Sequence, residues 1–258
     1  MKNIFSSTTL TSQAFAIICI LVTIAGIYVY GFGLQEFLIL TLGYFIYGSL
    51  GIVVTFHRYL THKSYETYPW LVKLFSIFGC VGGTGSTIAW VAIHINHHLK
   101  SDKIDDPHSP RHKGLRVFNL DYEKGIDPNT RWRIRHLITD PFHQFLHKYY
   151  MLIIIGWGLA VYLIGGVYGL VWFHLAPAAF GSFMSNIVNY MGHRPKMPGG
   201  FRRYNLNDDS TNNWLWAIPS WGETWHNNHH RHPKNFSCGE KWWEIDISAY
   251  IIRLIKTN

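Results

Sequence analysis

The sequence predicts an all-α membrane protein: four transmembrane helices in two hairpins, carrying a cytoplasmic helical domain rich in histidine that binds two metals. Three observations predict this class, namely long uncharged stretches, a one-sided distribution of basic residues, and repeated histidine clusters. Only 15% of the 258 residues are charged, whereas ordinary soluble domains have roughly 25%. The aromatic content of 16% excludes a disordered chain. Three widely spaced cysteines exclude a disulfide scaffold and a thiolate metal site.

Two stretches of the chain are long enough to supply the four helices. Glu36 is the only charged residue in 14–56, and 149–192 contains none. Each stretch is about twice the roughly 20 residues that one membrane helix needs, and each has glycines near its middle. Two buried helix pairs in a soluble core are disfavoured, because soluble helices of this length usually carry a charged face. We expect a single domain, 1–258, with spans at about 14–30, 37–56, 150–164 and 168–190.

The basic residues predict the orientation of these spans. All 23 lysines and arginines lie in the N-terminal tail, in 57–148 or after residue 193. Because basic residues favour the cytoplasmic side, we expect both termini and the parts 57–148 and 191–258 to be cytoplasmic. The net charge of +8 then favours an anionic membrane surface or an acidic protein partner. No recognition motif supports a nucleic acid partner.

Two further apolar segments have two interpretations each. The stretch 70–93 contains four glycines and a lysine, and we expect a helix that lies at the membrane interface or packs under the cytoplasmic domain. The stretch 242–256 mixes aromatic, aliphatic and charged residues. It is typical of an interfacial segment or of an ordinary amphipathic closing helix.

Nine of the 16 histidines form a pattern that indicates a metal centre. On a helix, residues at i, i+3 and i+4 share a face, so two clusters each present three imidazoles on one side. His57 and His62, at i and i+5, converge only if their helix ends or unwinds between them. Asn189 and His193 share a face at i and i+4. Neutral imidazole suits zinc, copper, iron and nickel, and nine rings exceed the four ligands of one zinc. The candidate ligands are His57, His62, His94, His97, His98, Asn189, His193, His226, His229 and His230.

These clusters resemble the HxxxxH, HxxHH and HxxHH boxes of integral-membrane fatty acyl desaturases, most closely the Δ9, stearoyl-CoA desaturase-like branch. The segments Asp105-Asp106-Pro107-His108 and Gly222-Glu223 agree with sequences that flank those boxes, and Asn189 with His193 matches an additional ligand helix. The resemblance runs from about Gly43 to Trp243.

The resemblance implies a di-iron centre that uses O2 as co-substrate. It places one iron on His57, His62, His94, His98 and His229, and the other on His97, His193, His226 and His230, with Asn189 acting through a water. The implied substrate is an acyl-CoA, an acyl-carrier-protein ester or an acyl lipid. The chain lacks the HPGG motif of a fused cytochrome b5 domain. We therefore expect a separate electron donor, ferredoxin or cytochrome b5.

Carboxylates beside the boxes are candidates for fixing the imidazole tautomers. Asp102, Asp105, Asp106 and Glu223 are nearest in sequence, although each is equally typical of a surface charge.

Two alternatives stay open at this point. A fatty acyl hydroxylase or acetylenase would carry the same boxes. A membrane protein that stores or transports metal is a more distant reading, because transporters place their ligands near the bilayer midplane. Here the candidate ligands lie at or beyond the ends of the expected spans.

Overall fold

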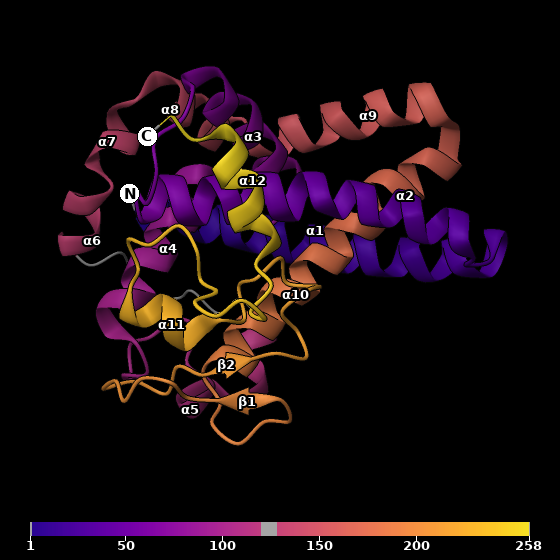
Figure 1. The fold of residues 1–258 in the computed structure, drawn as a ribbon. Coiled ribbons are helices and arrows are strands. Elements are labelled where there is room, and N and C mark those ends of the chain that lie inside the picture. The colour runs from indigo at the N-terminus through magenta and orange to yellow at the C-terminus, as the bar shows by residue number, and fades with distance from the viewer. Residues whose placement is uncertain (1, 120–127, 258) are drawn as a thin grey trace.

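The computed structural model describes residues 2–119 and 128–257, and this part of the chain is mainly helical (Figure 1). Residues 120–127, in the middle of the expected cytoplasmic part, and the two terminal residues lie outside it. The short strands β1 and β2 pair antiparallel, with Gly200 opposite Asn213. The elements are α1 (Lys2–Tyr30), α2 (Leu34–Tyr44), η1 (Phe45–Thr61), α3 (Pro69–Val81), α4 (Thr87–Lys100), α5 (Pro110–Lys113), η2 (Gly114–Asn119), α6 (Pro128–Arg133), α7 (Arg135–Thr139), α8 (Pro141–Lys148), α9 (Tyr150–Gly169), η3 (Leu170–Leu175), α10 (Ala176–Gly192), β1 (Gly200–Phe201), β2 (Asn212–Asn213), α11 (His226–Arg231) and α12 (Ile247–Ile255).

Three helices of the described chain are long and apolar enough to cross a membrane, namely Thr11–Tyr30, Leu34–Thr61 and Tyr150–Gly192. The first two meet at the expected break, where Gly31 has a φ of +76° that a glycine adopts readily. Large apolar side chains on these helices are exposed, for example Leu21 at 61% and Ile164 at 90%. Extended apolar surface of this kind is typical of contact with lipid. The three long helices therefore suggest a membrane protein.

The third apolar stretch is divided by a turn near its middle. It continues from α9 through η3 into α10, but Gly166 has non-helical angles, with φ of 61° and ψ of −159°. Figure 1 shows α9 running outward and the chain turning back along η3 and α10. The turn lies where the sequence predicts a hairpin, so the stretch forms two arms. The number of membrane crossings remains a prediction.

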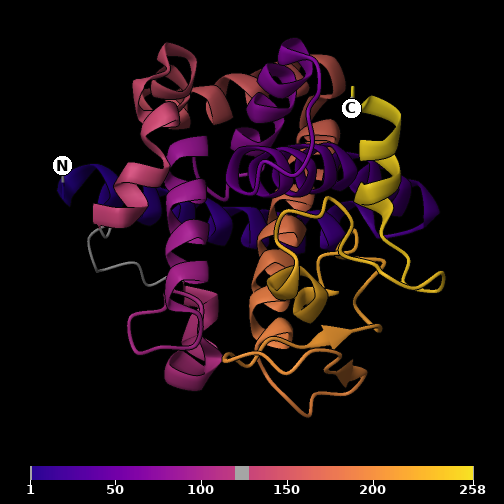
Figure 2. The ribbon, with the colours of Figure 1, turned by 60° about the vertical axis from the view of Figure 1, so that its left-hand side comes forward.

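The second apolar helix packs closely against α3. A Cβ on Gly51 would lie 2.3 Å from the backbone nitrogen of Gly79, so the two helix backbones nearly touch there. The expected single helix over 70–93 is instead two helices, α3 and α4. The helix is interrupted between them, at Gly83 and Gly85, whose φ values are +82° and +124°. This break lets α3 lie on η1 while α4 runs on toward the histidines (Figure 2).

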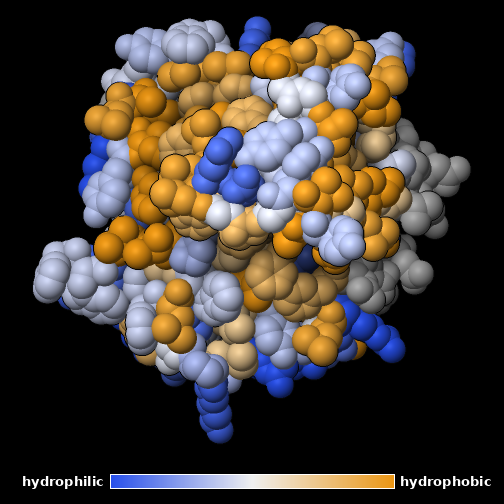
Figure 3. Space-filling view, turned by 90° about the vertical axis from the view of Figure 1, so that its right-hand side faces the viewer, coloured by the Kyte–Doolittle hydropathy of each residue, from blue (hydrophilic) through white to orange (hydrophobic). Residues whose placement is uncertain are grey.

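The C-terminal helix α12 has an inner and an outer face. Ile252 is fully buried in a cluster with Val54, Tyr65 and Phe75, whereas Leu254 is 85% exposed. The inner face packs as expected of an amphipathic closing helix, and the exposed Leu254 also fits an interfacial segment. Figure 3 views the face on which the outer ends of α1, α2 and α9 lie. It shows apolar side chains across the upper part of that face and more polar ones below.

Candidate metal centre

The helix η1 is a π-helix, and its wider turn brings His57 and His62 together. Its backbone hydrogen bonds span five residues, and the His62 N–H donates to the His57 carbonyl at 3.1 Å. In a π-helix, residues at i and i+5 lie on one face. The two ring centroids are therefore 4.8 Å apart. The sequence predicts a span that ends at Phe56 and a helix that ends or unwinds between His57 and His62. In the structure it runs on to Thr61, because the wider turn already makes the two rings converge.

Helices α4 and α11 each supply rings to two groups. On α4, His94 and His98 are one turn apart and join the first group, while His97 joins the second. On α11, His226 and His230 join the second group and His229 joins the first. The N-terminus of α4 is fixed by Ser86, whose hydroxyl accepts a hydrogen bond from the Ala89 N–H. Both helices are therefore needed to complete either group.

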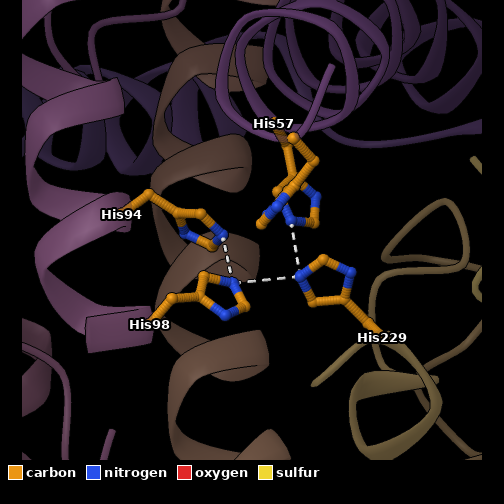
Figure 4. A group of neighbouring side chains, drawn as sticks. His57, His94, His98 and His229 are labelled. Carbon is orange, nitrogen blue, oxygen red and sulfur yellow. Dashed lines mark hydrogen bonds between the residues drawn. The ribbon is translucent and has the colours of Figure 1, made fainter. Parts of the chain in front are cut away.

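The first group contains five imidazoles that point at a common centre. Nε2 of His57 lies 3.0 Å from Nε2 of His229, which lies 3.1 Å from Nε2 of His98. Nε2 of His98 is in turn 3.0 Å from Nε2 of His94 (Figure 4). The group is His57, His62, His94, His98 and His229, with its candidate donor atoms all within 4.8 Å of one another.

The second group contains four imidazoles and adjoins the first. Nε2 of His226 and His193 are 2.9 Å apart, and the His98 and His230 rings from the two groups are 4.5 Å apart. The group is His97, His193, His226 and His230. The two groups contain the same histidines as the two ligand sets that the resemblance implies. That these histidines bind metal remains a prediction.

The donor atoms fit a cation at each centre. Nε2 of His62, His97 and His230 is buried without a hydrogen-bond partner among the described residues. Buried polar atoms in proteins are nearly always satisfied. A metal ion between the rings would satisfy these atoms together, since neutral imidazole nitrogen is a good ligand for iron.

Four carboxylates hold the outer nitrogens of these rings. Nδ1 of His97 lies 2.9 Å from Asp106, Nδ1 of His193 lies 2.8 Å from Asp102, and Nδ1 of His230 lies 2.9 Å from Asp208. Glu223 contacts Nδ1 of His57. An Nδ1–H that donates to a carboxylate leaves Nε2 free to face a metal.

Three of the four carboxylates named from the sequence are among these partners. The fourth, Asp105, is exposed. Asp208 was missed, because it precedes His230 by 22 residues in an irregular segment and no spacing marks it.

Arg58 is a second residue that the sequence did not single out. Its guanidinium donates to Glu223 at 2.8 and 3.3 Å, to Asp246 at 3.0 Å and to the Phe236 carbonyl at 2.7 Å. Asp246 also caps α12 by accepting from the Ala249 N–H. Arg58 therefore ties the first histidine box to the segment around the third box and to the C-terminal helix.

Burial keeps most of these imidazoles neutral. It lowers the pKa of His230 to about 4, and other ring charges contribute. His97 is the exception, because the charge of Asp106 and its hydrogen bond raise the pKa although burial alone lowers it. Neutral rings keep their nitrogen lone pairs for a metal. Burial also lowers the pKa well below the ordinary value for His62, His94, His98, His226 and His229.

Asn189 lies beside the second group. Its side-chain amide is 3.3 Å from Nδ1 of His108, and the His108 ring is 5.4 Å from that of His97. His108 is not among the candidate ligands, but it is buried, and this burial lowers its pKa to about 3. Its place in the Asp-Pro-His segment was the signal that could have marked it.

A cavity lies between the helices η1, α4 and α10 and reaches both histidine groups. One ring of each group, His94 and His226, lies in its wall. Much of the rest of the wall is apolar or lacks a side chain, with Ile52, Gly181 and Trp221 as examples. An extended apolar ligand in this cavity would reach both histidine groups.

Comparisons with known proteins agree with this geometry. The model of the family described as Fatty acid desaturase matches residues 32–247. The sn-1 stearoyl-lipid 9-desaturase of Anabaena variabilis is 33% identical over 219 residues, which cover 83% of this chain and 78% of that protein. Delta-9 acyl-lipid desaturase 1 of Arabidopsis thaliana is 33% identical, over 81% of this chain and 68% of the relative. An acyl-CoA C20 Delta5-desaturase of Anemone leveillei is 34% identical, over 83% and 68%.

Proposed function

This chain belongs to the fatty acid desaturase family and is an oxidoreductase, and we propose that it introduces a cis Δ9 double bond into a long-chain acyl group. The observation that carries the proposal is the convergence of nine histidines in two adjacent groups at one wall of an apolar cavity.

The two groups would hold two irons. One would be held by His57, His62, His94, His98 and His229, and the other by His97, His193, His226 and His230, with Asn189 acting through a water. Together with O2 and electrons from a donor, the irons supply the oxidising power that unactivated C–H bonds require and that side chains lack.

The protein's own residues position the reacting parts. The cavity between η1 and α10 would bind the acyl chain, with apolar walls such as Ile52 and Trp221 that exclude water. Asp106 and Glu223 hold the Nδ1–H of His97 and His57, so that both rings keep Nε2 turned inward. The acyl carbons that pass His94 and His226 would be those that react.

The substrate and its delivery follow from the relatives and the charge pattern. Two of the three relatives above are named as lipid desaturases acting at position 9, which supports an acyl group carried in an intact lipid. We propose four membrane spans, with both termini and the metal centre on the cytoplasmic side, because the basic residues favour that side. Electrons would come from a separate donor, ferredoxin or cytochrome b5.

The test is a fatty acid profile of a host that lacks its own desaturase. Wild-type protein is expected to produce cis Δ9 monounsaturated chains, found mainly in membrane lipid after brief labelling. His97→Ala and His229→Ala are expected to abolish the product while the protein still enters the membrane. His232→Ala is the matched control, since this exposed histidine follows the third box but belongs to neither group. Full unsaturation from either ligand variant would contradict the proposal.

A further inference from the structure

The two histidine groups differ in the charge that surrounds them. We call His97, His193, His226 and His230 the four-histidine position, and His57, His62, His94, His98 and His229 the five-histidine position. We infer that the four-histidine position binds its cation first and holds it more tightly than the five-histidine position does. This inference rests on the proposed function only in taking both groups as metal positions.

The four-histidine position is backed by three carboxylates, Asp102, Asp106 and Asp208. Neutral groups hold them in place. Asp106 accepts from the backbone N–H of Asp102 and of His108, and Asp102 accepts from the Ser109 hydroxyl. Within residues 2–119 and 128–257, no lysine or arginine side chain pairs with any of the three. Arg111 acts electrostatically on Asp102 and Asp208 but forms its ion pair with Asp209, so none of the three carboxylates is neutralised by an ion pair with arginine or lysine.

The five-histidine position has fewer carboxylates against its rings. In the described chain a carboxylate contacts only one of its five rings, where Glu223 meets His57. The same carboxylate binds the guanidinium of Arg58 at 2.8 Å. That cation is shared with Asp246, offsets part of the charge of Glu223 and lies in the first box itself. A metal here gains little from surrounding negative charge.

The size of the difference follows from the number of carboxylate partners. A partner on a ligating ring typically changes metal affinity by about 10- to 100-fold. Two more such partners favour the four-histidine position by about 100- to 10,000-fold. The fifth imidazole at the other position adds one neutral donor and offsets part of this difference. We therefore expect a ratio at the lower end, about 100-fold.

Metal titration of the full chain measures the ratio directly. Detergent-purified protein is stripped with a chelator and titrated with Zn²⁺ in competition with a chromophoric chelator. Two steps are expected, with dissociation constants about 100-fold apart. His226→Ala removes a ligand of the four-histidine position and should eliminate the tighter step. His62→Ala removes one of the five ligands of the other position and should weaken the weaker step alone, because four imidazoles still suffice for one zinc.

A matched pair of aspartates tests the cause. Asp208→Asn should weaken the tighter step by about 10- to 100-fold and leave the weaker step unchanged. Asp209→Asn is the control, because this neighbouring carboxylate pairs with Arg111 rather than with a histidine. Asp208→Glu keeps the charge and should retain the tighter step, which separates loss of charge from misfolding.

Three results would overturn the inference. These are two steps of equal affinity, loss of the tighter step in His62→Ala rather than in His226→Ala, and equal effects of the Asp208 and Asp209 substitutions. Failure to bind two Zn²⁺ ions per chain at all would instead count against the proposed di-metal function. The two failures are therefore distinguishable.

Discussion

Replacing Arg58 by methionine tests the buried charge cluster that supports the first histidine box. The Arg58 side chain is 2% exposed and is the cationic partner of Glu223 and Asp246, which are 11% and 3% exposed. Methionine has a similar length but no charge, so the two carboxylates would lose this partner. Breaking a buried pair in this way costs about 3–5 kcal/mol. For a chain of this size that corresponds to a fall of about 6–20 °C in melting temperature.

The assay is thermal unfolding of the metal-free protein in detergent, followed by tryptophan fluorescence. Arg253→Met is the control, because this exposed arginine on α12 packs on the Tyr250 ring and forms no ion pair in the described chain. The double variant with Glu223→Gln should recover part of the loss, since it removes one of the uncompensated charges. An Arg58→Met protein that melts within about 2 °C of the control would refute the reasoning, because that gap is below 1 kcal/mol.

Three glycine substitutions test the packing around the centre, with Gly156→Ala as their common control, since a Cβ there has no heavy atom within 4 Å. Gly192→Ala places a Cβ 2.8 Å from the His226 ring; elemental analysis should show less bound metal per chain than in the control. Gly51→Val pushes η1 away from the α3 backbone. Thermal unfolding should show that the free energy of unfolding falls by about 1–3 kcal/mol. Gly181→Leu fills part of the cavity and should lower the share of long unsaturated chains in the fatty acid profile. For each substitution, a result equal to the control would contradict the packing described here.

The histidine faces of α4 and α11 could be predicted because helical periodicity is a local property. The division of each face could not be derived in the same way. His94, His97 and His98 share one side of α4, so periodicity alone does not say which ring serves which group. That division depends on where α10 and α11 lie, and it came only from the resemblance.

The remaining site residues depend on contacts that local sequence does not encode. Arg58 meets Glu223 across 165 residues of chain. The five-residue hydrogen bonding of η1 could not be read from the sequence, because the same residues also fit an ordinary α-helix. The apolar stretches and the turn near Gly165 and Gly166 were predictable from composition and glycine placement, and the structure places the turn at Gly166.

The reciprocal contribution of α4 and α11 has an evolutionary consequence. Each helix gives two rings to one position and one ring to the other, so deleting either of these two helices would remove rings from both positions. Selection therefore acts on the pair as one inherited unit, and a working ancestor with only one of the two positions could not be reached by removing either helix.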